Sequence, residues 1–148
     1  IDVSGKTKTE RIAKAVALVK MNPELLAKIR ENNIPKGNVL ECARIAGILA
    51  AKKTADLIPL CHNIELENVE LNFKFGRSGI SIESLARATA KTGVEMEAIV
   101  ACSIAAITIY DMCKMFSKEI EIQDVYLLEK RGGKSGVYKR QDCFDKSE

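Results

Sequence analysis

A chain of 148 residues fits one domain with a sizeable core, and a net charge of +3 is too small to require a nucleic-acid partner. Hydrophobic residues make up 47% of the chain and charged residues 29%, as in ordinary globular proteins. No uninterrupted apolar run approaches 18 residues and no charged-then-apolar leader is present, so neither a membrane span nor export is expected. We expect a single domain over 1–148, with 139–148 as a frayed tail.

The cysteines favour free thiols over disulfides or a metal site. They form no CxxC pair, and their odd number leaves one unpaired in any disulfide scheme. Because His62 is the only histidine, zinc would need scattered cysteines as ligands. We therefore expect no metal site and free thiols in a reducing cytoplasm. The five cysteines are Cys42, Cys61, Cys102, Cys113 and Cys143.

The first element, Thr7–Met21, fits the spacing of a helix and that of a strand, and no cap or breaker decides between them. We predict a strand, because a strong helix start follows directly in residues 22–24, Asn-Pro-Glu. Asn22 is the expected N-cap of that helix. The helix is predicted over 23–32 and ends before Ile34-Pro35.

A second helix is predicted over Val39–Lys53. Asn38 and Glu41 have the spacing of a capping box at its start. Lys36 lies just before this N-terminus, where free backbone N–H groups favour anions, although spacing alone favours a solvated loop lysine. Residues 54–63 read as a connector.

Two strands joined by a short turn follow. The apolar positions of Ile64–Phe75 change parity part of the way along, which predicts a bulge near Glu67-Asn68. The turn is Gly76–Gly79. Ile80–Lys91 alternates with small side chains on one face, which predicts close packing of another element there.

The stretch Gly93–Phe116 is predicted to be a helix buried on most sides, since 17 of the 23 residues after Gly93 are apolar. Thr92 and Glu95 have capping-box spacing at its start. A last strand is expected at Glu119–Lys130. The order strand, helix, helix, strand, strand, helix, strand predicts an α+β, ferredoxin-like sandwich: an antiparallel sheet with helices packed on one face.

Charged residues on this apolar helix are candidates for chemistry. Asp111 and Lys114 lie one turn apart, either as a surface ion pair or as a buried pair poised for proton transfer near neutral pH. Their apolar surroundings favour the buried pair. Glu97 shares the Asp111 face of the helix but precedes it by 14 residues, about 21 Å along the axis.

Two further candidates lie outside the helix. The loop Arg131–Gly136, RGGKSG, can hold phosphate through backbone N–H groups and the Lys134 ammonium, although it is not a Walker A loop. A plain surface loop is an equally good interpretation. His62 must carry any imidazole chemistry, although a lone histidine is more often structural.

Several stretches together resemble one family. KGNVLECARIAGILAAKKTADLIPLCH, KTGVEMEAIVACSIAAITIYDMCK and LLEKRGGKSG are similar to the cyclic pyranopterin monophosphate synthases, the molybdenum cofactor biosynthesis protein C family. Fainter similarity includes the opening IDVSGK, so the resemblance covers nearly the whole chain. The succession of LIPLCH, GVEMEA, YDMCK and GGKSG is highly specific.

The resemblance implies a cytoplasmic, ferredoxin-like enzyme that converts 3′,8-cyclo-7,8-dihydro-GTP into cyclic pyranopterin monophosphate and releases pyrophosphate. It also implies a homohexamer, a trimer of dimers, with active sites at subunit interfaces. No nucleic acid or membrane is implied as a partner. The residues leave open whether Mg²⁺ accompanies the triphosphate.

The resemblance also assigns roles. The family's catalytic aspartate and lysine fall on Asp111 and Lys114; we expect Lys114 to be the acid/base and Asp111 to orient it, and the reverse assignment stays open. The sequence has Asn63 where the family usually has proline, and Asn38 where it usually has aspartate. The residues that match substrate-binding positions are Leu60, Cys61, His62, Met96, Glu97, Lys36 and Lys134.

Two rival functions come from other classes of protein. A non-catalytic nucleotide-sensing oligomer would use the phosphate-binding lysines without needing an acid/base pair. A ferredoxin-like RNA-binding module would need exposed aromatic side chains in a ribonucleoprotein-like pattern on the sheet, and the chain has seven aromatic residues and no such motif. Turnover of the cyclised GTP derivative separates the enzyme from both.

Overall fold

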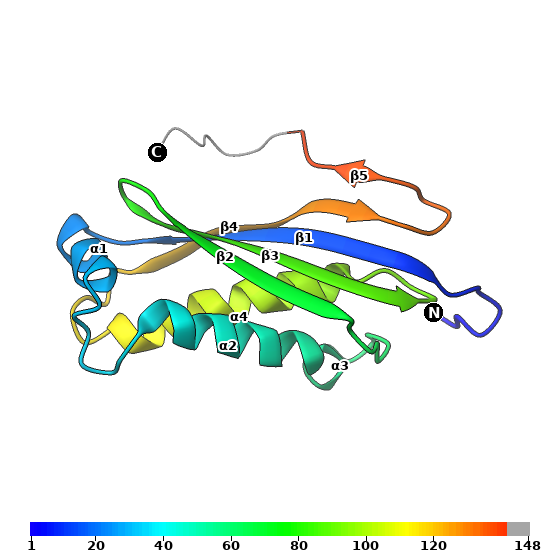
Figure 1. The fold of residues 1–148 in the computed structure, drawn as a ribbon, viewed down its shortest axis with the longest axis horizontal. Helices are drawn as coiled ribbons and strands as arrows, with labels where there is room; N and C mark the ends of the chain where they lie inside the picture. The colour runs from blue at the N-terminus through cyan, green and yellow to red at the C-terminus, as the bar shows by residue number, and fades with distance from the viewer. Residues whose placement is uncertain (142–148) are drawn as a thin grey trace.

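The computed structural model of the protein describes residues 1–141, which form an antiparallel five-stranded sheet with helices on one face (Figure 1). The strands lie in the order β2-β3-β1-β4-β5. Their bounds are β1 Thr9–Lys20, β2 Asn68–Phe75, β3 Gly79–Ala90, β4 Glu121–Arg131 and β5 Tyr138–Lys139. The helices are α1 Pro23–Arg30, α2 Val39–Lys52, α3 Thr54–Leu57 and α4 Glu95–Cys113. This arrangement confirms the predicted α+β sandwich of ferredoxin-like type.

Side-chain caps start α1 and α2 as predicted. The Asn22 side chain accepts a hydrogen bond of 2.8 Å from the Leu25 backbone N–H, and the Asn38 side chain accepts one of 3.1 Å from the Glu41 N–H. Asn38 therefore caps its helix as predicted. The two caps fix where the chain leaves β1 and where the loop carrying Lys36 ends.

The ambiguous first element is a strand, because it lies in the middle of the sheet. β1 pairs with β3 along one edge and with β4 along the other, and on the face away from the helices Ile12, Val16 and Leu18 are also partly or fully buried. Its helix-facing residues Ala13, Ala15, Ala17 and Val19 are fully buried. A strand in this position needs an apolar run rather than strict alternation, which explains why the sequence also fits a helix.

The hydrogen bonds at the start of β2 fit the predicted bulge near Glu67-Asn68. Asn68 is the register partner of Arg87, and the Glu67 N–H also donates a 2.8 Å hydrogen bond to the Arg87 carbonyl, so two residues oppose one. Further irregularities, which were not predicted, lie in β4. Its register with β1 shifts near Leu128 and again near Asp124, which has a φ of 52°.

α4 packs on β3 and β1 as closely as the small side chains of β3 predict. The even-numbered positions of β3 face the helix and are buried. The buried Ser84 hydroxyl donates a 2.6 Å hydrogen bond to the Ala98 carbonyl of α4. α2 runs beside α4 on the same face of the sheet (Figure 1). Within residues 1–141, α4 is the one helix long and apolar enough to cross a membrane, but 56% of its apolar window is buried in the protein, as in a core helix.

The predicted capping box at the start of α4 is wrong. Val94 is the N-cap and makes no side-chain hydrogen bond. The Glu95 carboxylate instead forms a 3.1 Å ion pair with Lys130 of β4. The contact ties the helix start to the sheet, so Glu95 is structural for a different reason from the predicted one.

Two short elements were not predicted. Residues 54–57 of the expected connector form α3, and Tyr138–Lys139 pair with Glu129 and Lys130 as β5. Lys139, expected to begin a frayed tail, therefore lies in a strand, and residues 142–148 with Cys143 lie outside the described residues. The other four cysteines are free, as expected: Cys42, Cys61, Cys102 and Cys113.

Gly47 permits the close approach of α2 to α4. A Cβ there would lie 2.8 Å from the Ala101 carbonyl oxygen and 2.7 Å from a Leu71 methyl group. We expect Gly47→Ala to lower the free energy of unfolding by roughly 1–3 kcal/mol through overpacking, although alanine is the better helix former. Urea denaturation measures the change. Gly5→Ala, where a Cβ meets nothing within 4 Å, is the matched control, and equal stability of both variants would contradict this packing.

Candidate active site

The predicted acid/base pair lies at the C-terminal end of α4 and gains a third member. The Lys114 Nζ atom lies 2.9 Å from one Asp111 carboxylate oxygen. Lys36, from the loop before α2, lies 3.7 Å from the other oxygen and donates a 3.1 Å hydrogen bond to the Asp111 backbone carbonyl. We call Lys36, Asp111 and Lys114 the C-terminal cluster. A separation of 75 residues hides the Lys36 contact from sequence analysis.

The expected burial of this pair is wrong for the single chain. The Asp111 and Lys114 side chains are 59% and 53% exposed. The hydrogen bond and charge of Lys114, with a smaller contribution from Lys36, lower the pKa of Asp111, and the same hydrogen bond raises the pKa of Lys114. Both groups are therefore charged at neutral pH: a carboxylate held between two ammonium groups.

A second group of predicted residues meets at the other end of α4. Glu97, on the first turn, is 2% exposed, and its carboxylate accepts a 4.0 Å contact from the Cys61 thiol. Its second oxygen is buried and has no hydrogen-bond partner among residues 1–141. Burial raises the pKa of Glu97, and burial followed by the nearby Glu97 and Glu95 charges raises the pKa of Cys61. The site thus holds a buried acceptor without a donor.

The remaining predicted residues at this end are chain neighbours of Cys61 or of Glu97, the buried acceptor. Met96 precedes it on α4 and is half-buried, whereas Leu60 is 91% exposed. The His62 ring is exposed, and its Nε2 atom lies 2.6 Å from the Ile1 carbonyl oxygen. We call Leu60, Cys61, His62, Met96 and Glu97 the N-terminal cluster. An open cavity of about 720 Å³ beside His62 is lined in part by Lys8, Glu65, Glu67, Thr89 and Lys91.

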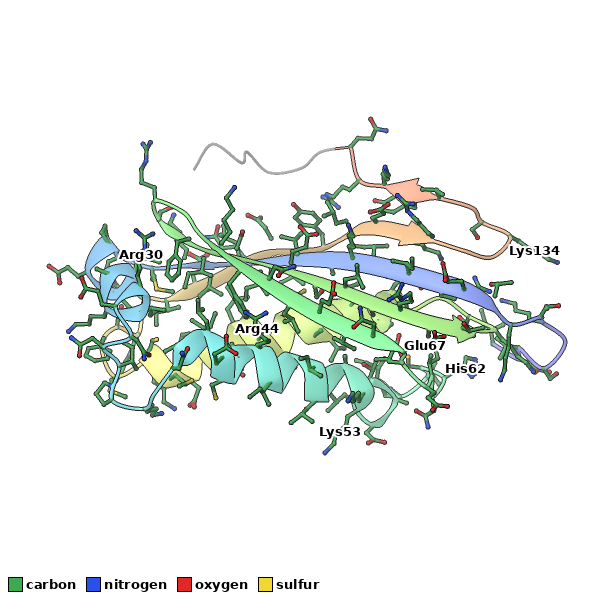
Figure 2. The ribbon with its side chains drawn as sticks, in the orientation of Figure 1. Arg30, Arg44, Lys53, His62, Glu67 and Lys134 are labelled. Carbon is green, nitrogen blue, oxygen red and sulfur yellow. The ribbon has the colours of Figure 1, made fainter. Side chains whose placement is uncertain are left out.

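Lys134 lies at the same end of the sheet as His62, away from Arg30 at the other end (Figure 2). It is exposed in the loop between β4 and β5, where Gly132, Gly133 and Gly136 have positive φ angles. Lys134 therefore lies at the same end of the sheet as the N-terminal cluster, and Lys36 belongs to the C-terminal cluster. No group of three or more His, Cys, Asp or Glu side chains suited to a metal ion occurs in residues 1–141.

Sequence analysis missed Arg11, which fixes the Lys134 loop. Its guanidinium donates hydrogen bonds of 3.2–3.3 Å to the carbonyl oxygens of Ala90, Lys91 and Gly132. A Cβ on Gly133 would displace the same guanidinium, and the φ of 75° at this position also favours glycine. Only the folded sheet brings these carbonyls together, and no sequence spacing could have identified the contact.

Comparison with known proteins gives one consistent result. The model of the MoaC family matches residues 1–133. Cyclic pyranopterin monophosphate synthase of Peptoclostridium acidaminophilum is 48% identical over 95% of this chain and 90% of its own length. The synthases of Desulfatibacillum aliphaticivorans and Syntrophomonas wolfei are 53% and 55% identical over 93% and 92% of this chain, and 88% of each relative. None of these names supports the nucleotide-sensing alternative.

Arg11→Lys is predicted to loosen the Lys134 loop, because an ammonium keeps the charge but cannot span three carbonyls. Each lost hydrogen bond costs about 1 kcal/mol, so amide hydrogen exchange in Gly132–Gly136 should accelerate about fivefold or more. Arg77→Lys in the β2–β3 turn is the matched control. Unchanged exchange in the Arg11 variant would show that the loop does not depend on this side chain.

Glu97→Gln is predicted to stabilise the protein at neutral pH and not in acid. Burial raises the pKa of Glu97 in the folded state. The protonated carboxyl group therefore contributes stability below the unfolded-state pKa, and this contribution is lost as pH rises through the folded-state pKa. The amide of the variant does not ionise, so we expect its free energy of unfolding to exceed that of the wild type by on the order of 1 kcal/mol at pH 8. Thermal unfolding from pH 3 to pH 8 measures it, with exposed Glu121→Gln as control. A gain that is independent of pH would contradict the burial of an ionised carboxylate.

Proposed function

This chain belongs to the MoaC family, and we propose that it is a cyclic pyranopterin monophosphate synthase of molybdenum cofactor biosynthesis. Its substrate would be 3′,8-cyclo-7,8-dihydro-GTP, a cyclised GTP derivative, and its products cyclic pyranopterin monophosphate and pyrophosphate. The observation that carries the proposal is the pair of clusters at the two ends of α4. The C-terminal cluster supplies charged groups for proton transfer. The N-terminal cluster supplies a buried acceptor and an imidazole, and the glycine-rich loop with Lys134, suited to binding phosphate, lies at the same end of the sheet.

The C-terminal cluster suits the bond-making steps. Closing a cyclic phosphate requires a ribose hydroxyl to attack the α-phosphorus while pyrophosphate leaves, so positioning and charge stabilisation dominate. The Lys114 ammonium, whose pKa is raised, is a proton donor and a cation for developing phosphate charge. Asp111 holds that ammonium at 2.9 Å and, as a carboxylate, is the available base. Lys36 adds a second cation.

The N-terminal cluster suits recognition of the ring system. The unpartnered Glu97 oxygen is an acceptor for ring or exocyclic N–H groups, and burial makes an unmade hydrogen bond there costly. Met96 and Leu60 offer apolar contacts beside it. His62 and Lys134 offer donors for phosphate at the same end of the sheet.

One chain cannot bring the clusters together, which supports an active site between two chains. Glu97 and Asp111 lie on one continuous helix, 14 residues or about 21 Å apart. An isologous contact between two copies would place the C-terminal cluster of one beside the N-terminal cluster of the other. Apolar side chains on α2 and α4 that are 52–57% exposed suit such a contact: Ile45, Leu49 and Ile107. We infer a homohexamer, a trimer of dimers, in the cytoplasm, and Mg²⁺ as a possible companion of the triphosphate.

The two-chain site predicts complementation between inactive variants. Asp111→Asn and His62→Ala should each lower kcat by roughly 100-fold or more. When the two are refolded together, half of the dimers are mixed, and one of their two sites has both clusters intact. About a quarter of the wild-type activity should return. Pyrophosphate release measures the recovery.

The control for complementation is Asp111→Asn refolded with the double variant Asp111→Asn, His62→Ala. No mixed dimer in that sample contains an intact site, so activity should stay low. Native mass spectrometry verifies that subunits have mixed. Absence of recovery in properly mixed Asp111→Asn and His62→Ala would place the whole site in one chain and contradict the proposal.

A further inference from the structure

Residues 1–6 fold back over the His62 end of the sheet, and we call them the N-terminal strap. The Ile1 carbonyl oxygen lies 2.6 Å from His62 Nε2, and the Ser4 carbonyl accepts a 3.4 Å hydrogen bond from the Lys91 ammonium. Two local hydrogen bonds shape the strap: Lys6 N–H to the Val3 carbonyl and Ser4 N–H to the Asp2 carboxylate. The strap therefore occupies two side-chain donors, the His62 ring and the Lys91 ammonium.

Both donors border one cavity. The cavity of about 720 Å³ beside His62 is also lined by Val3 of the strap and by Lys91. Thr89 and Thr92 add hydroxyl groups to its wall. Imidazole, ammonium and hydroxyl groups facing one open space form a donor set suited to a phosphate chain.

The backbone of Lys91 is held in place while its ammonium is available. Lys91 follows the last residue of β3, and the Arg11 guanidinium donates a 3.2 Å hydrogen bond to its carbonyl. The side chain is half-buried, and within residues 1–141 its ammonium forms no ion pair, although Glu65 and Glu67 line the same cavity. Within residues 1–141 its partner is the neutral Ser4 carbonyl, at the long distance of 3.4 Å.

We propose that Lys91 is a further phosphate-binding residue of the substrate site, and that it exchanges the Ser4 carbonyl for a phosphate oxygen when the triphosphate binds. The exchange is favourable because a phosphate oxygen carries a charge opposite to that of the ammonium, whereas the Ser4 carbonyl is neutral. Phosphate reaching Lys91 and His62 displaces the strap from both. This inference rests on the proposed function, which supplies the triphosphate.

Isothermal titration calorimetry with inorganic triphosphate tests the residue. Lys91→Ala should weaken binding about tenfold, the scale of one charge-assisted hydrogen bond, and Lys91→Arg should restore most of it. Lys74→Ala removes the same charge at the far end of β3, where Lys74 pairs with Ser81, and should bind like the wild type. Thermal unfolding of each variant verifies that it is folded.

Amide hydrogen exchange tests the displacement. Binding of triphosphate should accelerate amide hydrogen exchange at Ser4 and Lys6 in the wild-type protein. Unchanged protection of these two amides would contradict the proposal that phosphate displaces the strap. If folded Lys91→Ala binds as tightly as the wild type while His62→Ala or Lys134→Ala binds more weakly, Lys91 is not a phosphate ligand and the proposed function stands. If the wild-type protein binds no triphosphate, the phosphate-binding part of the proposed function fails together with this inference.

Discussion

The length and burial of α4 constrain every other part of the site. The helix runs unbroken from Glu95 to Cys113, packs on β1 and β3, and cannot bend without disrupting that core. Glu97 and Asp111 are therefore kept about 21 Å apart, further than one nucleotide-sized substrate needs. A single chain thus presents two separate clusters, and the proposed site combines one cluster from each of two copies.

The two ends of α4 also differ in their electrostatics, because one is buried and the other exposed. At the buried end, desolvation raises the pKa of Glu97 and leaves an acceptor without a donor. At the exposed end, Lys114 and Lys36 lower the pKa of Asp111, and the C-terminal dipole of the helix favours the Lys114 ammonium. The first environment suits recognition of a neutral ring, and the second suits reactions in which charge develops on phosphate.

Features encoded locally could be predicted from the sequence. The caps at Asn22 and Asn38 and the alternation of β3 depend on neighbouring residues, and they are confirmed. Features that depend on tertiary contacts could not. The capping box of Glu95 is replaced by an ion pair with Lys130, and the contacts of Lys36 with Asp111 and of Arg11 with the Lys134 loop join distant segments. The single chain also leaves the Asp111–Lys114 pair exposed, whereas composition alone indicated burial.

The shortest distance between Lys114 of one chain and His62 of another, in an experimental structure of the assembled protein, tests the two-chain site most directly. The account predicts a distance well below the roughly 21 Å that separates Glu97 from Asp111 within one chain. An assembly in which every such distance between chains exceeds that separation would contradict it. In that case the clusters at the two ends of α4 could not act on one substrate.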